Sequence, residues 1–294
     1  MQGILIIDKP QDWTSFDVIA KLRGILATRK LGHSGTLDPM ATGVLPVFVG
    51  QSAKAVDLQL NHTKAYRATI RFGISTDTGD ITGTVLEQKN TLVTAQQLQE
   101  ILPKFIGNQM QIPPMYSAVK IDGVPLYKSA RQGKQIERKP RPVTFYKIEY
   151  LEQKAENEYE ILVSCSKGTY IRVLAEDIGK ALGVPATLSA LCRIQSGVWD
   201  ETHAVTLEYL QQLKQEKGID ALEEMLLDTE TVFLTLPLLE VDEKVYKRLL
   251  NGTATPKFPA EDGRYRVRFE GKFIGLAQVE ENILQVEKLF CERG

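Results

Sequence analysis

The candidate reactive group of this chain is Asp38, the only carboxylate in residues 33–46. Gly35 and Gly43 in the same run allow backbone conformations and close approaches that other residues resist. Pro39 fixes its own φ and favours an extended conformation at Asp38, so we expect a rigid turn that displays the carboxylate. A carboxylate held in place can serve as a nucleophile or a base. The structural alternative is that Asp38 caps a helix beginning near Pro39.

Further segments in the first two hundred residues combine charged, aromatic and small residues. They are Lys9-Pro10, Tyr66-Arg67-Ala68, TDTGD at 76–80, IPPMYSAVK at 112–120, CSKGTYIR at 165–172 and Leu191-Cys192-Arg193. In this order, and together with residues 33–46, they resemble the signature segments of the TruB family of pseudouridine synthases. The resemblance covers most of residues 1–200 and becomes weaker toward the C-terminus.

The resemblance implies a bacterial enzyme that isomerises the uridine at position 55, in the T loop of tRNA, to pseudouridine. Such a reaction breaks the glycosidic N–C bond of a uridine and rejoins the same base through carbon. It requires a carboxylate near the anomeric carbon of the sugar, a pocket that holds the detached uracil, and exclusion of water. Asp38 is then the essential nucleophile or base, and the resemblance outweighs the helix-cap alternative.

Arg172 and Tyr66 are the catalytic partners of Asp38 that the resemblance implies. On a helix starting near residue 169, the Arg172 guanidinium could reach Asp38 and keep ionised a carboxylate that burial would protonate. Without the family, a lone Arg is more often a surface salt bridge or a phosphate contact. Alternation along residues 66–72 places Tyr66 on the inward face of a strand. From there it could stack on a base extruded from the T loop.

Five further site residues are carried over from the resemblance. Tyr170 is expected to line the pocket, and Leu191 to supply an apolar wall for the uracil. His33 is expected to act as an aromatic wedge against the flipped nucleotides, whereas a capping or core histidine is the structural alternative. Asp80 is expected to order a loop near the site, and Lys9 to be structural or to contact the RNA.

The net charge of −1 hides two segments of opposite sign. Residues 116–147 carry eight Lys or Arg against two Asp or Glu, whereas residues 201–230 carry two against eight. The basic segment also contains aromatic residues, which suits a phosphate backbone with stacked bases; a solvated charged face is the alternative. We expect a basic insertion at about 112–142 to bind the T-arm stem-loop of tRNA directly. The chain would then be a stand-alone monomer without an obligate protein partner.

Composition excludes several other classes. Hydrophobic content of 43% and charged content of 25% are ordinary for a globular protein. The N-terminal apolar run at residues 4–7 is too short for a signal peptide or a membrane span, so we expect a cytoplasmic protein. Three unpaired cysteines and three scattered histidines indicate neither a disulfide framework nor a metal site. Without a phosphate-cradling glycine motif, no cofactor or ATP is expected.

The elements that must position these residues follow from periodicity. Apolar runs and alternation predict strands at 3–7, 66–72, 159–165, 264–270 and 272–279. Apolar stripes and capping residues predict helices from residue 14 or 15 to about 25, and at 98–105, 169–182, 206–217 and 219–227. Asp17 would complete a capping box with Thr14.

The expected fold class is α+β. The resemblance implies a pseudouridine-synthase core, with a mixed or antiparallel central sheet flanked by helices, at residues 1–236. Short strands after Leu236-Pro237 predict a small β-rich module at 237–294, which resembles a PUA RNA-binding domain. A β-extension packed on the catalytic domain is the alternative.

Two other functions remain open at this point. The first is a tRNA-binding protein that helps tRNA to fold, with the modification secondary or absent. The second is a glycosidase, which would need two carboxylates flanking the scissile bond. The sequence offers no convincing second carboxylate for Asp38.

Overall fold

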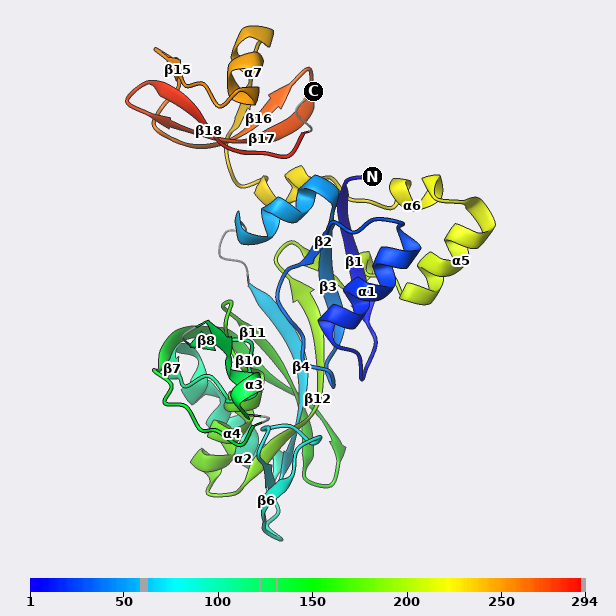
Figure 1. Ribbon diagram of the computed structural model, residues 1–294. Helices are drawn as coiled ribbons and strands as arrows, with labels where there is room; N and C mark the ends of the chain where they lie inside the picture. Colours follow the sequence, from blue (N-terminus) through cyan, green and yellow to red (C-terminus); the bar gives the residue numbers. More distant parts are fainter. Residues whose placement is uncertain (59–62, 122, 131, 292–294) are drawn as a thin grey trace.

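A central sheet of nine strands forms the larger part of the molecule (Figure 1). The computed structural model describes residues 1–58, 63–121, 123–130 and 132–291. His62, and Asp122 and Arg131 of the predicted basic insertion, lie outside the described residues. Nowhere in these described ranges does a helix have the length and apolar character needed to cross a membrane.

The sheet is mixed, as expected for this fold class. Its main path is β1 (Gly3–Lys9), β3 (Thr42–Val49), β12 (Ala186–Ser196), β4 (Lys64–Phe72), β11 (Glu158–Cys165), β10 (Arg141–Ala155) and β7 (Gly107–Gln111). β2 (Leu31–His33) pairs with β3, and β13 (Trp199–Asp200) pairs with β12. Within the described part of this sheet, only the β3–β12 pairing is parallel. It joins Thr42 to Cys192 and Gly43 to Arg193, directly after the Asp38 loop.

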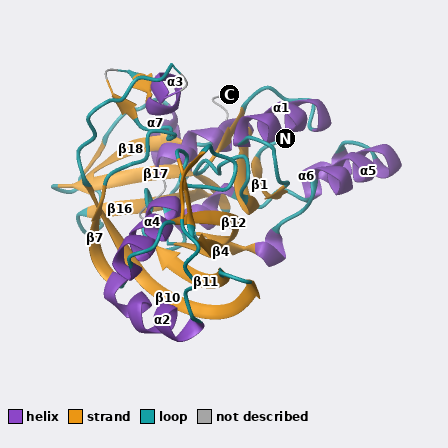
Figure 2. Cartoon of the chain, turned by 90° about the horizontal axis from the view of Figure 1, so that it is seen from below, coloured by secondary structure: helices purple, strands orange, loops and turns teal. Residues whose placement is uncertain are grey.

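Both faces of the central sheet are covered near β1. Leu5 and Ile7 pack into the larger core with the helices, whereas Ile4 and Ile6 pack into a second cluster with Phe233. The strand predicted from the apolar run at residues 3–7 is therefore buried on both faces. The larger core also takes residues from α1 (Ser15–Ile25), α2 (Ala95–Ile101), α4 (Ile171–Leu182), α5 (Leu207–Lys217) and α6 (Asp220–Glu224). Figure 2 shows α2 and α4 against the curved part of the sheet formed by β10 and β11.

The local signals for helix α1 are confirmed. Thr14 is the N-cap, and its side chain and that of Asp17 form the expected capping box. Val18, Leu22 and other members of the apolar stripe are buried. The alternation in β4 is also confirmed, because Tyr66 faces the core while Arg67 is exposed.

The helix-cap alternative for Asp38 is not observed: Ala41 donates its N–H to the Asp38 carbonyl at 3.0 Å in a single turn, and β3 starts at Thr42. One predicted helix boundary was wrong. The helix predicted to reach residue 227 ends at Glu224, because Leu227 pairs with Ile4 of β1 instead. Strand pairing over a long sequence distance here overrides the local helix signal.

A second sheet begins at Leu238. Its five strands are β14 (Leu238–Glu240), β16 (Gly263–Phe269), β17 (Lys272–Glu280), β18 (Ile283–Leu289) and β15 (Thr255–Pro256), with α7 (Glu243–Leu250) beside them (Figure 1). The predicted strands at 264–270 and 272–279 are confirmed. Phe290 stacks on Phe233, Phe273 packs against Phe233 with a tilted ring, and these contacts attach this sheet to the rest of the chain. The domain limits, and the PUA-like character of this module, stay predictions.

Candidate active site

Asp38 lies in the loop between β2 and β3, and both of its neighbours in the chain are tied to the N-terminal segment. The Ser15 hydroxyl accepts the N–H of Leu37 at 2.9 Å and donates to the Leu37 carbonyl at 3.3 Å. The N–H of Asp12 donates to the Pro39 carbonyl at 2.8 Å. These bonds on either side hold the Asp38 backbone in place, as a reacting group requires.

Lys9 completes this support from the end of β1. Its side chain is 0% exposed, and the ammonium donates to the carbonyls of Pro10 at 2.8 Å, Trp13 at 2.5 Å and Pro39 at 3.1 Å. Burial lowers the pKa of Lys9 to about 8, against the opposing charges of nearby aspartates. The arrangement favours the structural alternative for Lys9, because its buried ammonium offers no surface to an RNA.

Two glycines give the loop its shape. Gly35 has φ +77° and Gly43 has φ +95°, in the left-handed region that disfavours other residues. A Cβ on Gly43 would lie 2.3 Å from the Arg193 carbonyl oxygen, because the parallel pairing of β3 and β12 brings the two backbones together. The sequence-based expectation for these glycines is confirmed.

Gly43→Ala is therefore expected to destabilise the protein by about 2–4 kcal/mol, from backbone strain and overpacking together. Denaturant-induced unfolding measures this change. Gly24→Ala is the matched control, because Gly24 lies in α1 with no atom within 4 Å of an added Cβ. That variant is expected to gain up to about 1 kcal/mol. Equal stability of Gly43→Ala and the parent protein would contradict the steric argument.

Arg172, the second residue of α4, holds the Asp38 carboxylate with two nitrogens. Arg172 Nε lies 2.9 Å from Asp38 Oδ2, and Nη2 donates to Oδ1 at 3.1 Å. The guanidinium also donates to the carbonyls of Tyr116 and Thr78, each at 2.8 Å. Arg172 is 4% exposed, and these contacts hold its planar guanidinium in one orientation. The structure thus brings together the first two predicted site residues.

Asp80 lies on the other side of the same guanidinium. Its Oδ2 is 3.8 Å from Arg172 Nη1. Its Oδ1 accepts hydrogen bonds from the Thr78 hydroxyl and from the N–H and hydroxyl of Thr82. Asp80 therefore orders the loop that supplies the Thr78 carbonyl to Arg172.

The electrostatics of Asp38 differ in part from the sequence-based expectation. Its side chain is 34% exposed, but the carboxylate lies at the floor of a concave site with protein on most sides. Burial raises the pKa of Asp38, the charge of Asp80 raises it further, and Arg172 lowers it. Arg172 thus offsets the effect of burial without cancelling it.

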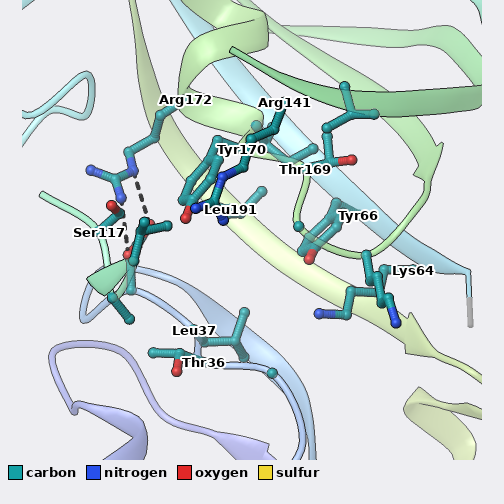
Figure 3. A pocket seen from close by; sticks show the side chains of 18 of the residues that line it. Thr36, Leu37, Lys64, Tyr66, Ser117, Arg141, Thr169, Tyr170, Arg172 and Leu191 are labelled. Carbon is teal, nitrogen blue, oxygen red and sulfur yellow. Dashed lines mark hydrogen bonds and ion pairs between the residues drawn. The ribbon is translucent and has the colours of Figure 1, made fainter. Parts of the chain in front are cut away.

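A cavity of about 690 Å³ opens above Asp38, a size within the range of small-molecule sites (Figure 3). Tyr66 of β4 and Leu191 of the adjacent β12 line it, together with Tyr170, the N-cap residue of α4. Burial raises the pKa of Tyr66 to about 12. The phenol is therefore protonated at neutral pH and can donate a hydrogen bond, but it is a poor base.

His33 is placed differently from the other predicted residues. It ends β2, is half-buried, and does not line the cavity. Its Nδ1 is buried without a hydrogen-bond partner among the described residues. Burial lowers the pKa of His33, and the nearby charges of Arg193 and Lys64 lower it further. The role of His33 as a wedge stays a prediction.

Sequence reasoning assigned no individual role to the other cations of the site, and it included only Arg141 in the predicted basic insertion. Lys64, Arg141 and Lys167 line the cavity, and Arg193 is 0% exposed behind it. Arg193 Nε donates to the Val44 carbonyl at 2.7 Å, although the two residues are 149 positions apart. The position of Lys64 could have been predicted from the sequence. Lys64 lies two residues before Tyr66, so its side chain lies on the same face of the strand.

The charges lining the cavity are strongly unequal. Asp38 is the only carboxylate among the described lining residues, whereas Lys64, Arg141, Lys167 and Arg172 supply four cations. Arg172 is engaged by Asp38, and the other three remain to attract an anionic substrate. This arrangement suits one nucleophile or base acting on a polyanion.

Comparison with known proteins identifies the family. Residues 23–171 match the model of the TruB family pseudouridylate synthase (N-terminal domain), and residues 172–234 match that of the tRNA pseudouridylate synthase B C-terminal domain. The tRNA pseudouridine synthase B of Stutzerimonas stutzeri (strain A1501) is 42% identical over 285 residues, which cover 96% of this chain and 93% of the relative. The protein of that name from Francisella tularensis subsp. novicida (strain U112) is 41% identical over 296 residues, covering 99% and 95%.

Solved structures share the fold of this chain. The crystal structure of a Cbf5-Nop10-Gar1 complex contains a similar chain, with a TM-score of 0.75 and 27% identity over 99% of this chain and 85% of that one. The structure of an H/ACA RNP bound to a substrate RNA containing 2'-deoxyuridine shares the fold, with a TM-score of 0.74 and 24% identity. Since the family models match most of the sequence and the relatives exceed 40% identity over nearly all of it, the chain belongs to the TruB family of pseudouridine synthases.

Proposed function

We propose that this pseudouridine synthase acts on the T loop of tRNA and converts the uridine at position 55, with Asp38 as the essential nucleophile or base. The observation that carries the proposal is the single carboxylate in a cationic cavity, held by the two-nitrogen contact from Arg172. tRNA as the substrate is supported by the relatives named tRNA pseudouridine synthase B.

The single carboxylate also separates isomerisation from glycoside hydrolysis. Most glycosidases place two carboxylates about the scissile bond, one as acid and one as nucleophile or base. Asp80 cannot take the second role, because it is 5% exposed, lies beyond Arg172 and is bonded to its own loop. Release of free uracil from the RNA would be the result that favours hydrolysis.

The remaining groups suit a base turned out of the RNA stack. Unstacking a nucleotide costs a few kcal/mol, which aromatic and apolar contacts inside a pocket offset. Tyr66 supplies an aromatic face and a protonated hydroxyl, and Leu191 supplies an apolar wall on the neighbouring strand. Tyr170 lines the same cavity at the start of α4.

The position of the basic insertion supports a role in holding the RNA over this cavity. Both of its ends line the cavity, through Ser117, Ala118 and Val119 on one side and Arg141 on the other. Lys120, Lys134 and Lys139 are exposed, and among the described residues they form no ion pair with a carboxylate. We propose that these lysines bind phosphates of the T-arm stem, that the C-terminal sheet adds a PUA-like RNA contact, and that the enzyme works as a monomer.

Changing Lys120, Lys134 and Lys139 together to Gln is expected to weaken stem-loop binding at least about tenfold. The reason is that each phosphate contact that is lost reduces the number of counterions released on binding. The slope of log K against log salt should become shallower by about 2, because each contact contributes about 0.7–0.9. The control changes Lys89, Lys154 and Lys180 to Gln, since each of these already pairs with a carboxylate. An equal loss of affinity in both triple variants would show that the insertion does not bind the RNA.

A direct test of the function uses a transcript of the T-arm stem-loop as substrate. We expect pseudouridine at position 55 and no other modified uridine. Mapping pseudouridine in RNA from cells with and without the gene extends the test to all tRNAs, and loss confined to the T loop is expected. Loss at another RNA position, with the T loop still modified, would refute the proposal.

A further inference from the structure

Lys64 and Arg193 are two cations at the cavity for which the described residues supply no counter-ion. Among the residues that the structure describes, the Lys64 ammonium forms no hydrogen bond or ion pair. Arg193 donates to the carbonyls of Val44 and Gly35, but its Nη1 is buried without a hydrogen-bond partner in the same described part. Arg193 is fully buried and Lys64 is half-buried. Since buried cations are normally paired, the free nitrogen of Arg193 beside a second cation requires an explanation.

The two groups flank a single glycine of the Asp38 loop. A Cβ on Gly35 would lie 2.6 Å from Lys64 Nζ and 3.3 Å from Arg193 Nη1. Gly35 and Lys64 line the cavity, whereas Arg193 lies fully buried behind them. His33 contributes a third unpaired nitrogen, Nδ1, in the surroundings of the same two cations.

The electrostatics of these two cations favour the binding of an anion. Burial lowers the pKa of Lys64 to about 8, and the charge of Arg193 lowers it further. Two like charges in a poorly solvated place repel each other, and an entering anion would relieve this repulsion for both. The absent side chain at Gly35 leaves the approach to Lys64 open.

We propose that Lys64, with Arg193 behind it, is a phosphate-binding site, and that its ligand is a phosphodiester of the RNA next to the flipped uridine. The proposal rests on the proposed function, because the ligand is part of the substrate. A neutral uracil needs amide-like partners, whereas an ammonium reinforced by a guanidinium selects an anion. Figure 3 shows Lys64 beside Tyr66 at one end of the cavity and Arg172 at the other. The space between them, beside Leu191, is left for the sugar and base.

The test pairs a protein change with a removed phosphate charge. Stem-loops carrying one neutral methylphosphonate linkage, placed in turn at each position around the target uridine, are titrated with Asp38→Asn protein, which does not turn over. One linkage is expected to weaken binding about tenfold. Adding Lys64→Gln to the Asp38→Asn protein is expected to weaken binding of the native stem-loop about tenfold. With the stem-loop that is already neutral at that linkage, the same change is expected to cause no further loss of affinity.

Two further variants make the result specific. Lys64→Arg keeps the charge and is expected to retain most of the affinity, whereas Lys154→Gln, an exposed lysine of β10 paired with Glu152, should show no coupling to any linkage. If Lys64→Gln does not fold, as thermal unfolding would reveal, the linkage scan on Asp38→Asn alone remains decisive. Equal binding of all neutral linkages, or an undiminished Lys64→Gln loss with each of them, would overturn the phosphate site.

The scan also separates this proposal from the proposed function. Pseudouridine formed by the unchanged enzyme, together with no coupling at Lys64, overturns the phosphate site alone. Coupling at one linkage, with no pseudouridine in the T loop, keeps the phosphate site and refutes the T-loop assignment.

Discussion

Asp38→Asn is expected to lower the rate of pseudouridine formation on a T-arm stem-loop by about 10³-fold or more, since a nucleophile or base contributes at least this much. Asparagine has nearly the same volume as aspartate, and its carbonyl oxygen can still accept one bond from Arg172. The fixed backbone of Leu37 and Pro39 keeps the loop in place. The change therefore removes the reactive charge and little else. Single-turnover kinetics measure the rate, and binding of the stem-loop should change less than about threefold.

The same variant also tests the tRNA-folding alternative. If the protein helps tRNA to fold independently of its chemistry, Asp38→Asn should accelerate folding of an unmodified tRNA as well as the parent protein does. If folding assistance depends on the modification, the variant should give no acceleration. Near-full pseudouridine formation by Asp38→Asn would show that Asp38 is not the reactive group.

Arg172→Met is expected to lower the rate by about 10²-fold at neutral pH, because it removes both the orientation and the charge that favour the Asp38 carboxylate. Arg172 lowers the pKa of Asp38 against burial, so its loss raises that pKa further. A carboxyl with a higher pKa is protonated over a wider range of pH. The acid limb of the rate profile should therefore move to higher pH, and activity should recover in part as the pH rises.

Two controls distinguish this effect from general damage to α4. Lys180→Met changes an exposed cation on the same helix and should leave both rate and pH profile unchanged. Arg172→Lys keeps the charge but loses the two-nitrogen contact, so it should shift the acid limb less than Arg172→Met while still lowering the rate. An unchanged acid limb in Arg172→Met would refute the electrostatic role and leave only a structural one.

Local signals in the sequence were sufficient for the parts of the site that depend on near neighbours. The capping box of Thr14 and Asp17 fixes the start of α1, and alternation in β4 places Tyr66 inward. The special backbone at Gly35 and Gly43 was also predictable, because glycine is the residue that adopts it without strain.

Features that depend on distant partners could not be predicted from local signals. Residue types alone left open whether Asp38-Pro39 begins a helix, and in the structure the chain turns once and enters β3. The burial of Lys9 depends on carbonyls that include Pro39, 30 residues away. The position of Arg193 depends on the parallel pairing of β12 with β3, and no local sequence pattern predicts this pairing.

The sequence by itself indicated the candidate carboxylate, its candidate partners and the family to which the chain belongs, because these follow from residue types at fixed short spacings. Only the tertiary structure decided the balance of charge around Asp38, the burial of Lys9 and the lack of a counter-ion for Lys64 and Arg193 among the described residues. The physical reason is that burial and pairing of charges are set by contacts between segments far apart in the chain. Those contacts exist only after β1, β3, β4 and β12 have assembled into one sheet.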